Sequence, residues 1–158
     1  MKKQLLNHIL PILVSVEAYD QIQKVALFPH SAGFSCEIYG KPTDKIAKAI
    51  ITFLECYACK EPSLPIPLAF ENMTPFTQKV LQFLQTIPFG QTYTYGQIAK
   101  AIDSPLGFRA VGGACGRNPF PLFLPCHRVL AKNGLGGFSE GLEIKNALLH
   151  FELNETSS

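Results

Sequence analysis

Three prolines within eight residues interrupt the middle of the chain and divide it into two parts. The stretch Glu61-Pro-Ser-Leu-Pro-Ile-Pro-Leu68 cannot continue a helix, because proline lacks an amide hydrogen and its ring fixes φ. A chain of 158 residues is long enough for one domain or two small ones. We therefore expect an N-terminal α/β domain over residues 1–68 and a second domain over residues 69–158.

The N-terminal part has the pattern of a small antiparallel sheet followed by a helix. β-rich runs cover residues 12–17, 23–28 and 33–39, and turn-forming stretches separate them. Residues 43–59 then carry apolar side chains at helical spacing, which predicts one amphipathic helix.

The C-terminal part is predicted to be mostly helical. Thr74-Pro75, Thr94 and Ser104-Pro105 are each typical of a helix start. The second and third of these helices are short and close in sequence, which is the outline of a helix-turn-helix. The expected fold class is therefore α+β, in which the N-terminal sheet and helix precede a mostly α-helical, winged-helix-like domain. The four expected helices cover residues 76–87, 95–102, 105–116 and 142–152.

Positive charge is concentrated in one interval of the C-terminal part. The net charge of +2 is too small to indicate a nucleic-acid partner by itself. However, Arg109, Arg117, Arg128 and Lys132 all lie within residues 104–139, where no acidic residue occurs. This distribution favours a local positive face of the kind that phosphate contact requires, with a chance cluster on a solvated surface as the alternative.

The third expected helix is also rich in glycine. Gly107, Gly112, Gly113 and Gly116 each cost up to about 1 kcal/mol relative to alanine in a helix interior. The usual reason for such a bare surface is the close approach of another backbone, either a packed helix or a nucleic-acid strand.

The clearest chemistry lies in the segment Pro125-Cys-His-Arg-Val129. A thiol attacks as the thiolate, and a histidine oriented by a carboxylate can take its proton. Glu152 could supply that carboxylate. Adjacent side chains of an extended strand point to opposite faces, so Cys126 and His127 need a turn or a bridging water to act together. The alternative is that Cys126 is a small buried residue and His127 an ordinary histidine.

Other classes of protein are disfavoured. The longest apolar stretch near the start, residues 9–16, is about half as long as the roughly 20 residues of a membrane span, so we expect a soluble, cytoplasmic protein without a membrane partner. Five cysteines cannot all pair in disulfides. Cys56 and Cys59, with His30 and Cys36, could in principle bind zinc, but no second close-spaced pair accompanies them, and we expect no metal.

A series of motifs runs through residues 74–152. In chain order they are Thr74-Pro-Phe-Thr77, Ile87-Pro-Phe-Gly90, Thr94-Tyr-Gly-Gln-Ile-Ala99, Arg109-Ala-Val-Gly-Gly113, Asn118-Pro119, Pro125-Cys-His-Arg-Val129, Gly137-Phe-Ser139, Gly141-Leu-Glu-Ile-Lys145 and Leu148-Leu-His-Phe-Glu152. This series resembles the family of methylated-DNA–protein-cysteine methyltransferases, the O6-alkylguanine-DNA alkyltransferases.

The resemblance implies DNA repair by irreversible, single-turnover transfer of an O6-alkyl group, such as methyl, from guanine in duplex DNA to a cysteine after base flipping. It implies that Cys126 is the alkyl acceptor and that His127 deprotonates it through a water. In the same positions, Glu152 would hold the imidazole and Tyr95 would donate toward the guanine ring. No cofactor is implied.

The resemblance also implies residues for binding the partner, double-stranded DNA that contains O6-alkylguanine. Arg109 would fill the gap that the flipped base leaves. A monomer is expected to suffice. The further residues implied to contact DNA are Thr94, Ala110, Gly113 and Arg117, and those implied to line the guanine pocket are Asn118, Val129, Phe138 and Ser139.

Two other functions are weighed against this reading. A non-catalytic lesion-binding module of the alkyltransferase-like type would share the recognition helix, but such proteins replace the cysteine that Cys126 provides here. A Cys-His hydrolase would need an oxyanion hole, which no part of the sequence indicates.

Overall fold

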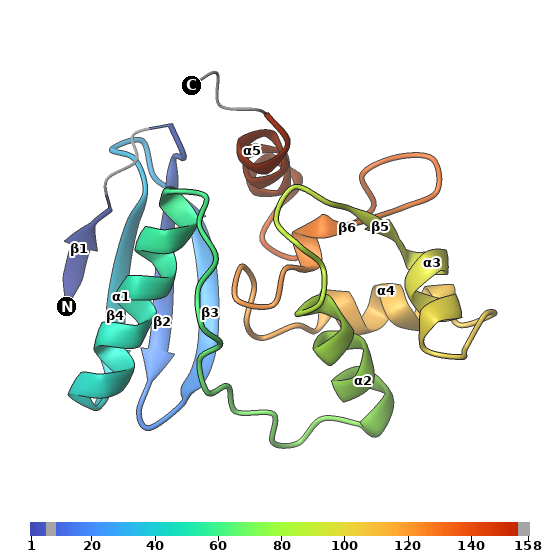
Figure 1. Ribbon diagram of the computed structural model, residues 1–158, viewed down its shortest axis with the longest axis horizontal. Coiled ribbons are helices and arrows are strands. Elements are labelled where there is room, and N and C mark those ends of the chain that lie inside the picture. Colours follow the sequence, from blue (N-terminus) through green and yellow to red (C-terminus); the bar gives the residue numbers. More distant parts are fainter. Residues whose placement is uncertain (6–8, 155–158) are drawn as a thin grey trace. The chain divides into compact units, whose positions relative to one another are not determined.

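The computed structural model describes residues 1–5 and 9–154. The chain divides between Ala69 and Phe70 into two compact units, coloured blue to green and green to red in Figure 1. Within the described residues, no helix has both the length and the apolar character needed to cross a membrane.

The first unit contains a four-stranded sheet with the strand order β1-β4-β2-β3. The strands are β1 (Lys2–Gln4), β2 (Ile12–Ala18), β3 (Ile22–Pro29) and β4 (Ser35–Gly40). β2 and β3 are antiparallel as expected, and β1, a strand that the sequence did not predict, is antiparallel to β4. β2 and β4 run parallel, which departs from the expected antiparallel sheet. After the β2–β3 hairpin, the chain crosses to the side of β2 that faces away from β3. A strand that begins there after a short connection, as β4 does, runs in the same direction as β2.

One helix, α1 (Asp44–Ala58), lies along a face of this sheet (Figure 1). Thr43 Oγ1 accepts a hydrogen bond from the amide of Ile46 at 3.2 Å and so caps the helix at the predicted position. The buried residues of α1 recur every three or four positions, which is the apolar stripe that the sequence predicts. They are Ile46, Ile50, Leu54 and Tyr57.

The second unit begins with α2 (Pro75–Leu84), which Thr74 caps and Pro75 opens. The helix ends three residues before the predicted end at Ile87. The reason is Pro88, which disfavours helical backbone in the residue before it. The amides of Thr86 and Ile87 instead donate to the carbonyls three residues earlier and form turns after the helix.

The expected helix-turn-helix consists of α3 (Tyr95–Ala101) and α4 (Phe108–Gly116), which pack against each other. A capping box joins Thr94 and Gln97 at the start of α3. The prediction that Ser104-Pro105 opens α4 is wrong. The amide of Gly107 donates to the carbonyl of Ser104 at 2.7 Å, so residues 104–107 close a separate turn and Gly107 becomes the N-cap.

A two-stranded parallel ladder joins distant parts of the second unit. β5 (Tyr93–Thr94) pairs with β6 (Val129–Leu130), with Tyr93 opposite Val129. Because α3 follows β5 directly and the 3₁₀ turn η1 (Cys126–Arg128) precedes β6, the ladder brings the start of α3 beside the Cys-His segment. The last helix, α5 (Leu142–Leu153), packs against η1.

Candidate active site

Cys126, His127 and Arg128 form a single 3₁₀ turn between Pro125 and β6. The amide of Arg128 donates to the carbonyl of Pro125 at 3.0 Å and closes this turn. Successive side chains in a 3₁₀ helix are about 120° apart, whereas those of an extended strand point to opposite faces. The turn therefore removes the opposite-face arrangement that an extended chain would impose on Cys126 and His127. All three side chains are buried.

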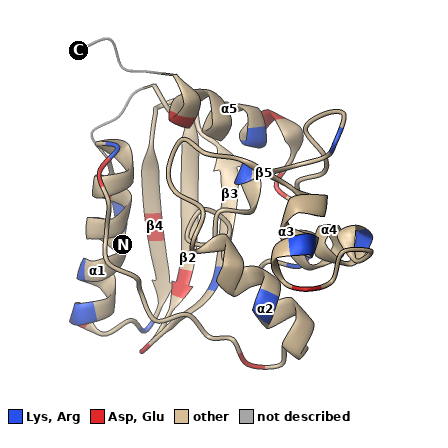
Figure 2. Cartoon of the chain, turned by 45° about the vertical axis from the view of Figure 1, so that its right-hand side comes forward, with Lys and Arg blue, Asp and Glu red and all other residues tan. Residues whose placement is uncertain are grey.

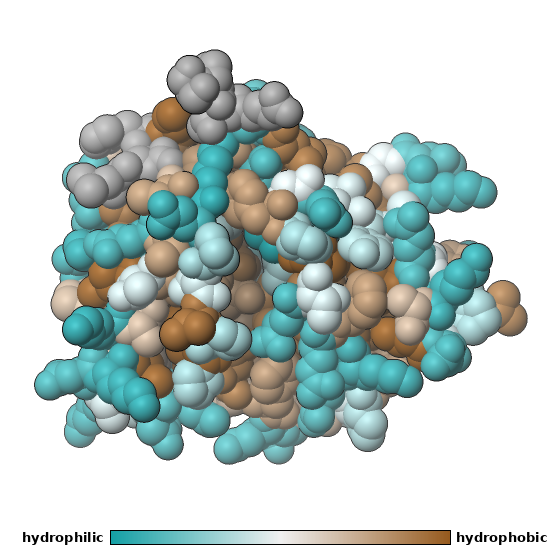
Figure 3. Space-filling model, viewed as in Figure 1, coloured by the Kyte–Doolittle hydropathy of each residue, from teal (hydrophilic) through white to brown (hydrophobic). Residues whose placement is uncertain are grey.

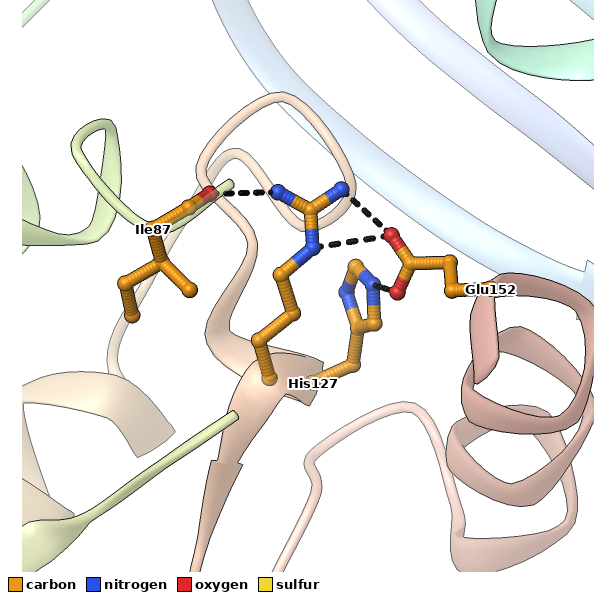
Figure 4. A network of polar contacts seen from close by, with 4 residues as sticks. Ile87, His127 and Glu152 are labelled. Carbon is orange, nitrogen blue, oxygen red and sulfur yellow. Dashed lines mark hydrogen bonds and ion pairs between the residues drawn. The ribbon is translucent and has the colours of Figure 1, made fainter. Parts of the chain in front are cut away.

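A polar network lies along one edge of the His127 ring (Figure 4). His127 Nε2 lies 2.7 Å from Glu152 Oε2 at the end of α5. The other carboxylate oxygen accepts from Arg128 Nε at 2.8 Å and also from Arg128 Nη2. Arg128 Nη1 donates to the Ile87 carbonyl at 2.8 Å. The carboxylate is thus shared between the imidazole and a guanidinium that is itself anchored to the backbone.

The network fixes which nitrogen of His127 can act as a base. Burial alone would raise the pKa of the Glu152 carboxyl, but the charges and hydrogen bonds of His127 and Arg128 outweigh it and hold that pKa below its ordinary value. An ionised carboxylate only accepts, so Nε2 must donate to it. In the neutral form of the ring, Nδ1 then keeps its lone pair, and it is buried without a hydrogen-bond partner among the described residues.

The thiol of Cys126 needs such a base. Burial raises its pKa to about 11, against the opposing effects of a hydrogen bond from Asn118 and the charge of Lys145. At neutral pH the group is therefore a thiol, and its reactivity depends on proton removal by a neighbour.

Lys145 on α5 is a central residue to which the sequence analysis gave no role, although it belongs to one of the motifs. Its side chain is fully buried, and Nζ donates to the carbonyls of Val129 at 2.7 Å, Leu135 at 2.5 Å and Gly137 at 3.0 Å. Burial lowers the pKa of the ammonium. The spacing of the two residues could have indicated that Lys145 is buried. Residues 145 and 152 are two helical turns apart, so Lys145 lies on the same face of the helix as Glu152, which was expected to point inward.

Tyr95 and the loop after β6 lie against each other. A Cβ placed on Gly136 would come 2.8 Å from the Tyr95 hydroxyl oxygen, and φ is +73° there, so this position requires glycine. Burial, with a smaller contribution from Cys115, raises the pKa of the Tyr95 hydroxyl, which keeps it protonated as a hydrogen-bond donor.

The predicted pocket residues lie on the segments around this loop. Asn118 Nδ2 donates to the Leu124 carbonyl and its Oδ1 accepts from the Phe120 amide, both at 2.9 Å, which fixes the turn that leads to Cys126. Ser139 Oγ donates to the Gly116 carbonyl at 2.7 Å. Two further predicted residues are Phe138, which is half-buried, and Val129, whose carbonyl is held by Lys145.

The predicted DNA-contacting residues lie on α4 and at the start of α3. Arg109, Ala110 and Arg117 are exposed, and Figure 2 shows basic residues on α3, on α4 and on the loop after β6. The guanidinium of Arg117 lies over Gly113, since a Cβ there would be 3.2 Å from Nη1. Thr94 serves as the cap of α3.

The structure corrects one member of the predicted positive face. Arg128 is buried and paired with Glu152, so it cannot present its charge to a phosphate. The sequence alone does not show whether an arginine next to a Cys-His pair, such as Arg128, is buried or exposed. The exposed positive charges of this interval are Arg109, Arg117 and Lys132.

The cysteines outside the site form no metal centre in the part of the chain that the structure describes, where no group of three or more His, Cys, Asp or Glu side chains gathers. Cys56 lies in α1 and is half-buried, and Cys59 is exposed at its end.

The family model described as 6-O-methylguanine DNA methyltransferase, DNA binding domain, matches residues 75–154. A methylated-DNA–protein-cysteine methyltransferase of Methanocaldococcus jannaschii is 42% identical over 120 residues, which cover 73% of this chain and 70% of the relative. A probable enzyme of the same name from Acanthamoeba polyphaga mimivirus and one from Methanocaldococcus vulcanius are each 52% identical over shorter regions. Those regions span 56% and 49% of these relatives, about half of their length.

Solved structures agree with this match. The crystal structure of Mycobacterium tuberculosis OGT in complex with DNA superimposes with a TM-score of 0.69 at 28% identity, over 89% of this chain and 92% of that one. The structure of an O6-methylguanine DNA methyltransferase from Methanococcus jannaschii gives a TM-score of 0.62 at 32% identity, over 100% of this chain and 96% of that one.

Proposed function

Because the chain belongs to the methylated-DNA–protein-cysteine methyltransferase family, we propose that it repairs DNA by transferring the O6-methyl group of guanine to Cys126, once per molecule. The observation that carries the assignment of roles is the buried 2.7 Å contact between His127 Nε2 and Glu152, in the turn that begins with Cys126. It leaves His127 Nδ1 as a base next in sequence to a thiol that needs one.

The proposed reaction is a single displacement at a saturated carbon. The proton of Cys126 passes through a water to His127 Nδ1, and Glu152 stabilises the resulting imidazolium. The sulfur then forms a bond to the methyl carbon as the bond from that carbon to O6 breaks. The Tyr95 hydroxyl donates a hydrogen bond toward the departing guanine ring, and the guanine finally takes up the proton that Cys126 gave to His127. No tetrahedral intermediate forms at a carbonyl carbon, so the site needs no oxyanion hole of the acyl-transfer type.

The lesion reaches this site only if the guanine leaves the duplex. We propose that α4 enters the minor groove, that Arg109 fills the gap in the stack, and that Thr94, Ala110, Gly113 and Arg117 contact the strand. Packing within the second unit does not explain all the glycines of α4. A Cβ on Gly116 would meet no atom within 4 Å, which supports an external surface as the reason for the bare helix.

The same proposal covers the organisation of the chain. Residues 69–158 would bind DNA and accept the alkyl group, and residues 1–68 would form a separate α/β domain. Asn118, Val129, Phe138 and Ser139 would enclose the flipped guanine. We propose that the protein acts as a monomer in the cytoplasm, without a cofactor.

The decisive experiment measures the mass of the protein after incubation with duplex DNA that contains O6-methylguanine. We expect a gain of one methyl group on Cys126, limited to one per molecule and absent in Cys126→Ala. Binding to the lesion without a gain in mass would instead indicate a non-catalytic lesion-binding module. Sustained turnover of a model ester would indicate a hydrolase.

The role of Arg109 has its own test. Arg109→Ala should slow repair of duplex DNA more than transfer from free O6-methylguanine base, because only the duplex leaves a gap to be filled. Lys48→Ala, which removes one exposed positive charge from α1, is the matched control. An equal fall with both substrates would contradict the proposed role.

A further inference from the structure

Two large apolar side chains are exposed where α3 connects to α4. Leu106 is 91% exposed and Phe108, the first residue of α4, is 47% exposed. They flank Gly107, the N-cap of the helix. In Figure 3, apolar surface shows among hydrophilic side chains over the part of the second unit where α3 and α4 lie. Two such side chains within three residues leave apolar area in water that an apolar partner could cover.

The backbone holds these side chains outward. The amide of Ser104 donates to the Ala99 carbonyl at 2.8 Å, and that of Gly107 donates to the Ser104 carbonyl at 2.7 Å. A Cβ on Gly107 would come 2.8 Å from Ser104 Oγ and 3.0 Å from the Ser104 carbonyl oxygen, so the close turn leaves little room for a larger residue. The exposure of Leu106 and Phe108 is therefore built into a bonded turn.

Charge indicates what kind of partner covers them. The guanidinium carbon of Arg109 lies 5.9 Å from the centre of the Phe108 ring, within the range of a cation–π contact. Residues 104–139 contain no acidic residue, and Asp103 is the one carboxylate of the connection between the helices. DNA combines negatively charged phosphates with bases whose stacked faces are apolar. An apolar pair of side chains beside an exposed arginine is complementary to both.

We propose that Leu106 and Phe108 form an apolar wedge that presses on the faces of the bases next to the lesion when the guanine is flipped out. This inference rests on the proposed function. Extrusion of a base exposes the faces of its neighbours to water, and Arg109 alone covers only part of that area. Proteins that bind the minor groove insert Phe and Leu side chains between base steps in this way. The wedge acts on DNA affinity and base extrusion, and does not touch the reacting atoms.

The test compares the double variant Leu106→Ala/Phe108→Ala with Leu142→Ala. The latter removes a side chain that is 50% exposed from the first position of α5. We expect the double variant to bind duplex DNA containing O6-methylguanine about tenfold more weakly, as for loss of one base–aromatic contact. The slope of log Kd against log salt concentration should not change, because no phosphate contact is lost. Leu142→Ala should bind like the wild type.

A second readout follows the base step itself. With 2-aminopurine placed beside the lesion, the wild type should increase its fluorescence on binding by unstacking it, and the double variant should give a smaller increase. Wild-type affinity and fluorescence in the double variant would overturn the wedge. Failure of the wild type to gain a methyl group would refute the proposed function instead, so the two failures are distinguishable.

Discussion

Replacing Glu152 with glutamine changes one atom of the buried network and inverts the hydrogen-bonding role of His127. The carboxylate accepts from His127 Nε2 and from Arg128. In the variant, the amide oxygen can still accept from the guanidinium, and the amide nitrogen then faces the ring. Nε2 must now accept, so the hydrogen moves to Nδ1, the nitrogen that we propose takes the proton of Cys126.

The expected loss of rate is large. A general base contributes about 10²–10⁴-fold, and the wrong tautomer of a catalytic histidine removes that contribution. Stability should fall as well. Removing one partner of a buried ion pair costs about 3–5 kcal/mol, and we expect the lower end, because the glutamine oxygen still accepts from Arg128. The side chain of Glu152 is 1% exposed, so solvent screens this interaction little.

The assay is the single-turnover rate of methyl transfer to the protein, measured by mass at several pH values. Without a base, transfer depends on spontaneous ionisation of Cys126, whose pKa is about 11. The rate of Glu152→Gln should therefore rise about tenfold per pH unit below that value, and its deficit should shrink as the pH rises. Glu143→Gln, an exposed change in the first turn of α5, is the control. A wild-type rate at pH 7.5, or a deficit independent of pH, would refute the reasoning.

The same variant should change how the free energy of unfolding falls at acidic pH. The pKa of Glu152 is lower in the folded protein than its ordinary value of 4.5, so the ionised group stabilises the fold at neutral pH. This contribution is lost as the pH falls below about 4.5 and through the folded-state pKa. Urea denaturation at pH 7 and at lower pH should show a smaller decline for Glu152→Gln than for the wild type, and equal declines would contradict the assigned charge.

Three further predictions concern the supports of the site. Lys145→Met should lower the free energy of unfolding by about 2 kcal/mol or more and move alkylation of Cys126 by iodoacetamide to higher pH. The control Lys79→Met on α2 should change neither quantity, and an unchanged pH profile in Lys145→Met would leave Lys145 a purely structural role. Thr94→Ala should cost about 1 kcal/mol in urea denaturation through loss of the capping box, and a wild-type midpoint would show that the cap contributes nothing. Gly136→Ala should displace the Tyr95 ring and slow methyl transfer, and an unchanged rate would argue against a close fit of the ring.

Local signals in the sequence were sufficient for much of the fold. The caps at Thr43, Thr74 and Thr94 are decided by contacts within three residues, so a short motif specifies them. The parallel pairing of β2 with β4 is different, because periodicity indicates which residues form a strand but not which strand lies beside it. The start of α4 was misplaced because the turn bond to Ser104 competes with a proline signal that is equally local.

The motifs around Cys126, through their resemblance to the family, indicated which chemistry we propose for this chain and which residues are its candidates, because the order of residue types is preserved in the sequence. Only the tertiary structure decided how they meet. It bends Cys126 and His127 into a 3₁₀ turn, places Glu152 against the ring across 25 residues, and turns Arg128 from an expected surface cation into a buried partner. It also buries Lys145 where its ammonium donates to the carbonyls of Val129, Leu135 and Gly137. The physical reason is that burial and electrostatic pairing depend on distance in space, and distances between remote residues arise only when α5 packs against η1.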